Sequence, residues 1–336
     1  MSHVFIIAEA GVNHNGSLEL ALQLVDAAKA SGADAVKFQT FRAESLATRS
    51  AHKAAYQERT TAVAESQFEM LQRLEMDAAD HRRLIDHCKD IGIEFLSSPF
   101  DEESADLLAE MDLPVFKVPS GEITNLAFLE HIARKGKPII LSTGMSTLGE
   151  VEEAIGILRG AGAGQLTLLH CVTEYPAPYE EVNLRAMQTL KTAFRLPVGY
   201  SDHTPGIEVA IAAVALGAEV IEKHFTLDRS LPGPDHAASL EPDELREMVW
   251  AIRHIEQALG DGIKMPTKSE KPNIAVARKS VVATRTMTAG HSLVLSDLAI
   301  KRPGNGIAPK LLTTLIGRTL CKSVDKDETI QWDSLA

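Results

Sequence analysis

Eight short apolar segments, rich in β-branched residues, recur along residues 4–226 and alternate with longer amphipathic stretches. This alternation indicates a parallel sheet whose strands are joined by helices, and eight parallel strands is the number that closes into a barrel. An open doubly wound sheet would need a glycine-rich phosphate turn after its first strand, whereas residues 9–16 read EAGVNHNG. We therefore predict a (β/α)8 TIM barrel with strands at residues 4–10, 35–40, 94–99, 115–121, 138–144, 166–172, 196–202 and 220–226.

The stretches between these segments carry helix signals. Ser17 is a plausible N-cap and Gly32 a C-terminal stop for the first helix, and Pro242 stands near the start of the last one. A long connection follows the second strand, and a connection of that length in a compact domain is typical of a lid or an interface. We predict this insertion at residues 41–76 and helices at residues 17–32, 101–111, 146–162, 206–218 and 241–260.

Composition changes after the last predicted helix, where residues 261–280 become rich in Lys, Pro and Gly. Such a composition favours a linker that crosses a domain boundary. The segment that follows contains only short strand-like runs and is small for an independent fold. We therefore expect it to pack against another surface, such as a second copy of the chain. We assign residues 1–262 to the barrel domain, 263–280 to the linker and 281–336 to a small C-terminal domain, with strand-like runs at 280–287, 297–303 and 317–324.

Charge and composition exclude several classes of protein. The net charge of −12 argues against a general nucleic-acid binder, although a small anionic substrate needs only a local basic pocket. No run of about 20 apolar residues is present, so no membrane span is expected. The N-terminus lacks a basic region and a signal-like cleavage site, which favours the cytoplasm. Cys88, Cys171 and Cys321 are far apart and are predicted to be reduced thiols.

Polar side chains gather at the carboxyl ends of the predicted strands, which is where barrel enzymes place their active sites. Two of these side chains are the lysines Lys37 and Lys117, and a lysine within a β-segment is costly unless it meets an anion. Three interpretations remain open: structural ion pairs with Glu9 or Glu122, a Schiff-base lysine as in aldolases, or a clamp for phosphate or carboxylate. The Ser-Gly-Glu that follows Lys117 favours the clamp, because hydroxyl and backbone N–H groups can bind an anion.

Two histidines follow the seventh and eighth segments. Side chains alternate faces along a strand, so Glu222 shares a face with His224, and Ser201 shares a face with His203. Two histidines at neighbouring strand ends, with a carboxylate beside one of them, can hold a divalent cation and leave positions open. The alternative is that they are two unrelated histidines in loops. Lys223 has the opposite parity to His224, so we expect it to point out of the barrel and to have no chemical role.

From the residues alone, the chain is predicted to be a barrel enzyme with a divalent metal, an anion clamp and polar groups that bind hydroxyls. That combination suggests carbon–carbon bond chemistry on a small phosphorylated or carboxylated substrate. At these same residues the chain resembles the sialic acid synthase family, which includes N-acetylneuraminate and legionaminate synthases. The motifs that carry the resemblance cover essentially the whole chain in order: IAEAGVNHNGS, VKFQT, FKVPSGE, LSTGMST, HCVTEYPAP, VGYSDHTPG, EKHFTLD, PGPDH, ARKS and KRPGNGI.

The resemblance implies condensation of phosphoenolpyruvate with an N-acetylated mannosamine-type sugar. The product would be a nine-carbon 2-keto sugar acid, N-acetylneuraminate or N,N'-diacetyllegionaminate, together with phosphate. The last motif lies in a segment that looks like the antifreeze-like (SAF, β-clip) domain of this family. The resemblance also implies a divalent metal, Mn²⁺ or Mg²⁺, and a domain-swapped homodimer in which the SAF domain completes the partner's site.

Roles carry over by motif. Glu9 would lie at the floor of the site, Glu222 would support the metal ligands, and Arg302 would reach into the partner's barrel to contact the acetamido group of the sugar. The predicted metal ligands are His203 and His224. The predicted catalytic residues are Glu9, Lys37, Lys117, Glu122 and Glu222. The predicted substrate-binding residues are Gln39, Ser98, Ser120, Thr173, Tyr175, Ser201, Asp235 and Arg302.

Two positions depart from the pattern of the neuraminate synthases. Phe38 stands where a histidine is common, and Thr173 stands where an asparagine is common. The resemblance makes Thr173 a sugar-contacting position. Sugars that lack the 6-hydroxyl and carry a 4-acetamido group are expected to bind in a less polar pocket. Legionaminate-type precursors therefore remain candidate substrates. The enzymatic rival is a Schiff-base aldolase that uses free pyruvate. The non-enzymatic rival, a sugar- or ice-binding protein, leaves the lysines and histidines unexplained.

Overall fold

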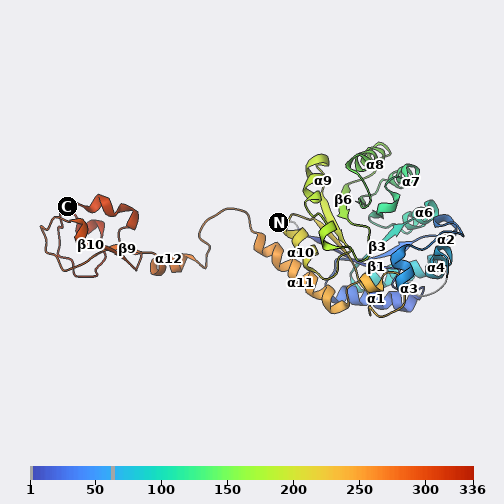
Figure 1. The fold of residues 1–336 in the computed structure, drawn as a ribbon, viewed down its shortest axis with the longest axis horizontal. Coiled ribbons are helices and arrows are strands. Elements are labelled where there is room, and N and C mark those ends of the chain that lie inside the picture. Colours follow the sequence, from blue (N-terminus) through green and yellow to red (C-terminus); the bar gives the residue numbers. More distant parts are fainter. Residues whose placement is uncertain (1–2, 62–64) are drawn as a thin grey trace. The chain divides into compact units, whose positions relative to one another are not determined.

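The computed structural model describes residues 3–61 and 65–336 of the chain. It divides into two compact units, Met1–Asp261 and Gly262–Ala336, which are called here the barrel unit and the C-terminal unit (Figure 1). Within the described residues, no helix combines the length and the apolar composition that crossing a bilayer requires.

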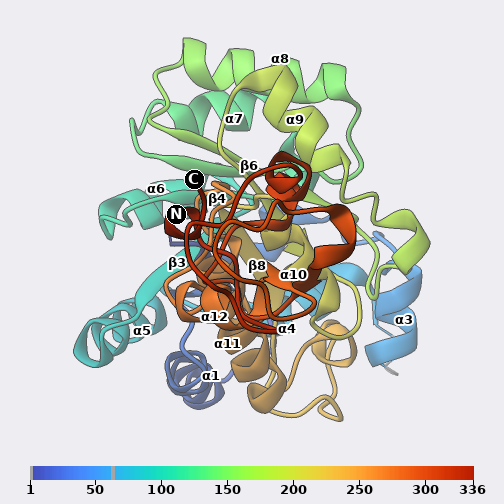
Figure 2. The same ribbon diagram turned by 90° about the vertical axis from the view of Figure 1, so that its left-hand side faces the viewer.

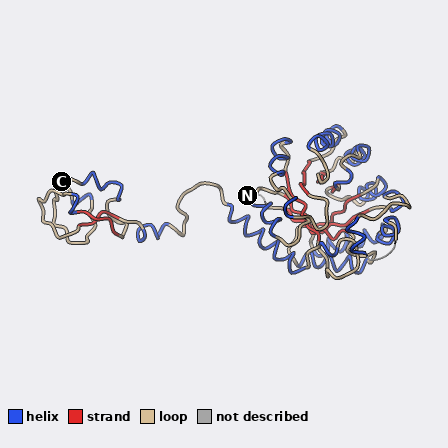
Figure 3. Tube along the Cα trace, in the orientation of Figure 1, coloured by secondary structure: helices blue, strands red, loops and turns tan. Residues whose placement is uncertain are grey.

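The described part of the barrel unit contains eight parallel strands, which lie inside a ring of helices (Figure 3). Their hydrogen-bonded order is β3-β2-β1-β8-β7-β6-β5-β4, and β3 lies beside β4, so the predicted (β/α)8 barrel is confirmed. All eight predicted segments form strands: β1 (Phe5–Gly11), β2 (Ala35–Thr40), β3 (Glu94–Pro99), β4 (Phe116–Val118), β5 (Ile139–Ser142), β6 (Leu166–Cys171), β7 (Val198–Asp202) and β8 (Val220–His224).

Helices surround the strands on the outside of the barrel (Figure 2). Ser17 caps α1 as expected, because its hydroxyl accepts a hydrogen bond from the N–H of Leu20. The predicted helices correspond to α1 (Leu18–Ala30), α6 (Glu102–Glu110), α8 (Leu148–Gly160), α10 (Glu208–Ala215) and α11 (Pro242–Leu259). Three further helices of the described barrel unit lie outside the predicted ranges: α5 (Ala78–Ile91), α7 (Leu126–Ala133) and α9 (Ala186–Phe194).

The described residues of the insertion after β2, 41–61 and 65–76, form three short helices, α2 (Ala43–Leu46), α3 (Ala55–Thr61) and α4 (Gln67–Leu74). A capping box fixes the start of α4: the Ser66 hydroxyl accepts from the N–H of Glu69, and the Glu69 carboxylate accepts from the N–H of Ser66. These described parts of the insertion are therefore helical, and they follow the carboxyl end of β2.

The barrel interior is layered. Its lower part is filled by apolar side chains from six strands, a packed plug rather than a pore. Every second residue of a strand points inward. The polar side chains two residues further along the strands therefore lie directly above this plug. The site is thereby placed at the carboxyl ends of the strands. The plug consists of Ile7, Ala35, Leu96, Ile140, Leu169 and Val220.

The C-terminal unit has its own apolar cluster, which includes Val281, Leu298 and Leu320. Strands β9 (Ser280–Ala283) and β10 (Leu298–Lys301) pair in antiparallel fashion. The strand predicted at residues 317–324 is wrong, because Thr319, Leu320 and Val324 form isolated bridges with three different segments instead of one ladder. The segment expected to be a linker also contains a helix, α12 (Lys271–Ala277), which has a proline in its first turn.

Asp297 anchors a turn of the C-terminal unit. Its buried carboxylate contacts His291 Nε2 at 2.7 Å, Arg285 Nη2 at 2.9 Å and the N–H of Val294 at 3.1 Å. These hydrogen bonds, the one with His291 above all, lower the pKa of Asp297 from 3.8 to about 2. A folded-state pKa below the unfolded value gives stability that is present above about pH 4 and lost as the pH falls through about 2.

We therefore expect the melting temperature of the C-terminal unit to fall as the pH drops from about 4 to about 2. The chain has two tryptophans, Trp250 in the barrel unit and Trp332 in the C-terminal unit, so fluorescence of a Trp250→Phe variant follows this unit. An Asp297→Asn variant should lower the melting temperature at neutral pH and flatten the acid dependence. An equally steep dependence in that variant would contradict this role of Asp297.

Candidate active site

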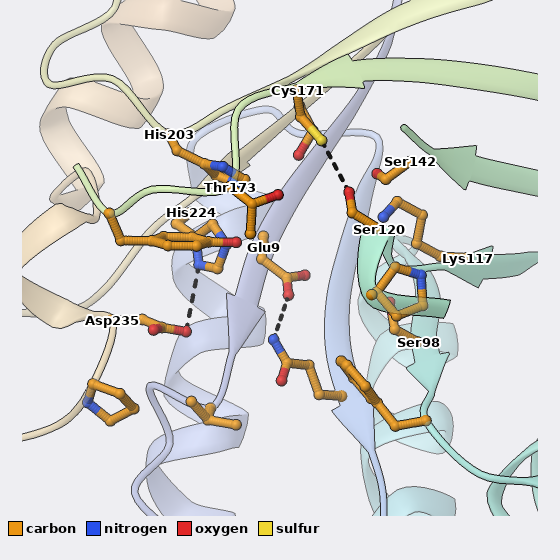
Figure 4. Close-up of a pocket in the computed structure, with 18 of the residues that line it drawn as sticks. Glu9, Ser98, Lys117, Ser120, Ser142, Cys171, Thr173, His203, His224 and Asp235 are labelled. Carbon is orange, nitrogen blue, oxygen red and sulfur yellow. Dashed lines mark hydrogen bonds and ion pairs between the residues drawn. The ribbon is translucent and has the colours of Figure 1, made fainter. Parts of the chain in front are cut away.

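A cavity of about 430 Å³ opens at the carboxyl ends of the strands (Figure 4). Side chains from all eight strands or from the loops after them line it. The structure thus brings together residues that are far apart in the sequence. The sequence-predicted residues that line the cavity are Glu9, Lys37, Gln39, Ser98, Lys117, Ser120, Thr173, Tyr175, Ser201, His203, Glu222, His224 and Asp235.

Two buried lysines and two buried carboxylates form the floor of this cavity. Lys37 Nζ lies 2.6 Å from Glu9 Oε2 and 3.9 Å from Glu222 Oε2, and it donates to Ser98 Oγ at 3.0 Å. Lys117 Nζ lies 3.4 Å from Glu222 Oε1. Glu222 therefore lies between the two lysines, and it takes the place of Glu122 in the predicted ion pairs because the inward parity of β8 directs it to the floor.

Burial and these contacts set the protonation states of the floor. Burial raises the pKa of Glu9 to about 7, although the nearby charge of Lys37 lowers this pKa. Burial also raises the pKa of Glu222, but Lys117 and Lys37 outweigh it and hold that pKa below its ordinary value. For Lys37, burial lowers the pKa, while Glu222 and Glu9 raise it by more. At neutral pH the floor can therefore gain or lose a proton at Glu9, as a general acid or base must.

The pKa of Lys117 moves the other way from that of Lys37. Burial lowers it, the neighbouring charge of Lys37 lowers it further, and Glu222 compensates only in part. Its nearest ion-pair contact is longer than that of Lys37. Lys117 is therefore the lysine whose charge would gain most from an anion bound in the cavity.

Small hydroxyl and thiol groups lie beside the lysines. The N–H of Gly144 donates to Ser120 Oγ at 2.9 Å, and Ser120 Oγ lies 3.1 Å from Cys171 Sγ. Gly144 is required here, because a Cβ atom at this position would lie 2.3 Å from Thr173 Oγ1. Thr173 Oγ1 is buried and has no hydrogen-bond partner among the described residues, so it is available to a bound molecule.

The two predicted histidines lie side by side, with ring centroids 5.4 Å apart. His203 Nδ1 lies 2.5 Å from the carbonyl oxygen of Val172, which leaves Nε2 with its lone pair. His224 Nδ1 is buried, lies 3.8 Å from Asp235 Oδ2 and has no hydrogen-bond partner in the described part of the chain. Burial lowers the pKa of both histidines, so both rings are neutral at pH 7, the form that binds metals.

The two histidine nitrogens could supply part of the coordination shell of a divalent cation. No three or more His, Cys, Asp or Glu side chains among residues 3–61 and 65–336 are grouped so that they could hold a metal by themselves. The fit rests on His203 and His224, since a buried nitrogen without a hydrogen-bond partner, such as His224 Nδ1, is uncommon unless something binds there. A cation held by two imidazoles would leave positions for water and substrate oxygens.

Three of the predicted sugar-binding residues line the same cavity as this pair. The ring of Tyr175 lies 4.2 Å from the ring of His203, measured between centroids, and 5.4 Å from that of His224. Gln39 donates to Glu9 Oε1 at 3.2 Å. Burial raises the pKa of Asp235 to about 6. Aromatic, amide and carboxyl groups thus face one space, as the recognition of a polar sugar requires.

Two predicted residues lie elsewhere. Glu122 does not line the cavity, because the turn after Ser120 directs its carboxylate to Asn125, whose side-chain amide donates to it at 2.8 Å. Arg302 belongs to the C-terminal unit, where it is exposed and its Nε donates to the carbonyl oxygen of Ala277.

Lys223 points away from the cavity, as its parity predicts, but it is fully buried. Its Nζ lies 2.8 Å from Asp202 Oδ2 and donates to the carbonyl oxygen of Thr204. The other oxygen of Asp202 accepts bonds from the N–H and the hydroxyl of Thr204. This network fixes the turn that carries His203, so Lys223 has a structural role that the sequence did not indicate.

The insertion contributes a wall of the cavity that sequence reasoning missed. Its length was the only signal, because short helices in a loop show no strand parity that would assign individual side chains to the cavity. The lining residues that were not predicted are Val12, Leu46, Gln57, Gln67, Met70, Leu71, Leu74, Phe100, Pro119, Gly121, Ser142, Met145, Cys171 and Pro234.

The profile of the NeuB family matches residues 24–264, and the profile of the SAF domain matches residues 278–336. The chain belongs to the NeuB family. It is 55% identical over 333 residues to N,N'-diacetyllegionaminic acid synthase of Campylobacter jejuni, a match that covers 98% of this chain and 100% of that protein. It is 48% identical to the N,N'-diacetyllegionaminic acid synthase of Legionella pneumophila, over 98% of this chain and 94% of that one.

Among solved structures, the NeuB chain described here is similar to the N-acetylneuraminic acid (sialic acid) synthetase of Leptospira borgpetersenii, solved in complex with citrate. The TM-score is 0.71 and the identity 37%, over 81% of this chain and 90% of that one. The predicted resemblance to the sialic acid synthase family is therefore confirmed, and so is the predicted antifreeze-like domain.

Proposed function

We propose that this NeuB chain condenses phosphoenolpyruvate with an N-acetylated mannosamine-type sugar, giving a nine-carbon 2-keto sugar acid and phosphate. The observation that carries the proposal is that two buried lysines, Lys37 and Lys117, face the same cavity as His203 and His224. A substrate that carries both a phosphate and a carboxylate suits the lysines, and an aldehyde oxygen suits a cation beside the histidines. Phosphate release from phosphoenolpyruvate that depends on an added sugar tests the proposal.

In this reaction C3 of phosphoenolpyruvate attacks the aldehyde carbon of the open-chain sugar, water adds at C2, and the tetrahedral intermediate loses phosphate. Lys37 and Lys117 offset the phosphate and carboxylate charges of the substrate. Glu9, with a pKa of about 7, exchanges a proton with the reacting groups. We assign Mn²⁺ or Mg²⁺ to His203 and His224, where a bound cation would polarise the carbonyl oxygen of the sugar.

The sugar that we propose is 2,4-diacetamido-2,4,6-trideoxymannose, the precursor of N,N'-diacetyllegionaminate. Two relatives named for that product support this choice. Thr173 supports it too, because it stands where neuraminate synthases commonly have asparagine, and it offers one buried hydroxyl in place of an amide. The pocket is accordingly less polar at the position that contacts the sugar.

We also propose a homodimer in which Arg302 of one chain enters the partner's barrel and contacts the acetamido group of the sugar. An Arg302→Ala variant should then raise the KM for sugar about ten- to a hundredfold, since it loses a charge-assisted hydrogen bond, while the KM for phosphoenolpyruvate changes little. Arg318→Ala, an exposed arginine of the same unit, is the matched control. Equal effects of Arg302→Ala on the two KM values would leave Arg302 with a purely structural role.

A further inference from the structure

One wall of the cavity is apolar and comes entirely from the insertion. It consists of Leu46 on α2 and Met70, Leu71 and Leu74 on α4, and these four residues are called the insertion wall. They pack with Val12 and neighbouring aromatic rings in a hydrophobic cluster that is separate from the barrel core. Met70 and Leu74 are each only 1% exposed. The wall is therefore a packed surface that faces the cavity.

Two contacts fix the insertion against the barrel. The hydroxyl of Thr60 on α3 donates to the carbonyl oxygen of Pro234, in the loop that follows β8, at 3.1 Å. The end of α4 lies against the loop after β1, where a Cβ atom at Gly16 would come within 2.4 Å of the carbonyl oxygen of Arg73. Gly16 also has a φ of +76°, which favours glycine. The glycine thus permits a close approach that holds the insertion wall in place.

The insertion wall carries no cationic side chain that lines the cavity. Among the described residues that line the cavity, the lysines are Lys37 and Lys117, both at the floor, and no arginine is present. The insertion contributes the four apolar residues of the wall and two uncharged amides, Gln57 and Gln67. A phosphate next to the wall would lose its water without gaining a cationic partner, whereas a methyl group would gain apolar contact.

Under the proposed function, the aldehyde carbon C1 lies beside the cation at His203 and His224. C6 is then at the end of the open-chain sugar that is farthest from these histidines, where an apolar group needs an apolar surface. We propose that the insertion wall is a subsite for an uncharged methyl group at C6. The wall thereby selects 6-deoxy sugars over 6-hydroxy sugars and excludes 6-phosphorylated ones.

The test compares sugars that differ only at C6: 2,4-diacetamido-2,4,6-trideoxymannose, its 6-hydroxy analogue and the 6-phosphate of that analogue. We expect kcat/KM to favour the 6-deoxy sugar over the 6-hydroxy sugar by roughly 10- to 100-fold, the range typical of a single small group in an apolar pocket. Leu71→Gln should reduce this preference about tenfold. Leu71→Lys should raise the relative kcat/KM for the 6-phosphate, because it supplies the missing cation.

Leu22→Gln is the matched control, because Leu22 is equally half-buried on α1 but packs on the barrel core away from the cavity. Each preference is a ratio of two kcat/KM values measured on one preparation, so the fraction of folded enzyme cancels from it. Leu46→Gln provides a second variant of the insertion wall. Equal use of the three sugars, or a preference that neither wall variant changes, would overturn the proposed subsite. Absence of phosphate release with every sugar would instead overturn the proposed function and the subsite with it.

Discussion

Removal of divalent cations is expected to abolish sugar-dependent phosphate release, and addition of Mn²⁺ or Mg²⁺ should restore it. A cation that polarises a carbonyl oxygen contributes several kcal/mol, so its loss should lower turnover by a factor on the order of 10³ or more. The assay is phosphate release in excess chelator, followed by titration with each metal. Full-rate turnover in chelator would contradict the assignment of a metal to His203 and His224.

The binding of Mn²⁺ can be followed without turnover, because the electron paramagnetic resonance signal of free Mn²⁺ decreases when the ion is bound. His203→Ala should weaken Mn²⁺ binding at least tenfold, by loss of one of two imidazole ligands. The matched control is His131→Ala, since His131 lies on α7 and contacts Asp106 far from the cavity lining. Equal affinity of the two variants would place the metal elsewhere.

Replacement of Lys117 by methionine should lower kcat/KM for phosphoenolpyruvate by about 10²- to 10³-fold, the loss typical of a preorganised group that stabilises developing charge. Methionine keeps the length and packing of the buried stem but removes the charge. Glu222 would keep its ion pair with Lys37, 3.9 Å away, and the hydrogen bond from Ser201. The KM for the sugar should change much less. Initial rates at varied phosphoenolpyruvate and fixed sugar measure the effect.

The control for Lys117 is Lys137→Met. Lys137 is also largely buried along its stem, but it contacts Asp112 and the carbonyl oxygen of Leu113 outside the cavity. The Lys137→Met variant should keep kcat/KM within about twofold, because Lys137 does not line the cavity. Borohydride reduction in the presence of pyruvate distinguishes the aldolase alternative: a covalent adduct at Lys117 would contradict the phosphoenolpyruvate mechanism, and an unmodified lysine agrees with it.

The sequence predicted the barrel because strand and helix periods repeat eight times, and parity then assigned most of the site. Lys37 and Gln39 point inward together, as do Glu222 and His224, since inward positions recur at every second residue. Parity also directed Lys223 outward. Family motifs added the sugar-binding positions, which residue patterns alone could not have assigned.

Parity could not predict what depends on contacts between distant segments. Glu222 was expected to support the histidines, yet its carboxylate lies between two lysines. Glu122 follows β4 in a turn, where alternation no longer determines direction, and it contacts Asn125 instead of the cavity. The burial of Lys223 follows from the Asp202 partner that the neighbouring strand supplies.

The most direct test of the central claim is phosphate release from phosphoenolpyruvate in the presence of Mn²⁺, with N-acetylmannosamine in one reaction and 2,4-diacetamido-2,4,6-trideoxymannose in the other. We predict phosphate release with each of the two sugars, with one phosphate formed for each keto acid. The kcat/KM should be higher for the trideoxy sugar. Faster release with N-acetylmannosamine would contradict the proposed sugar and make the chain a neuraminate synthase. Release with neither sugar would contradict the proposed condensation itself.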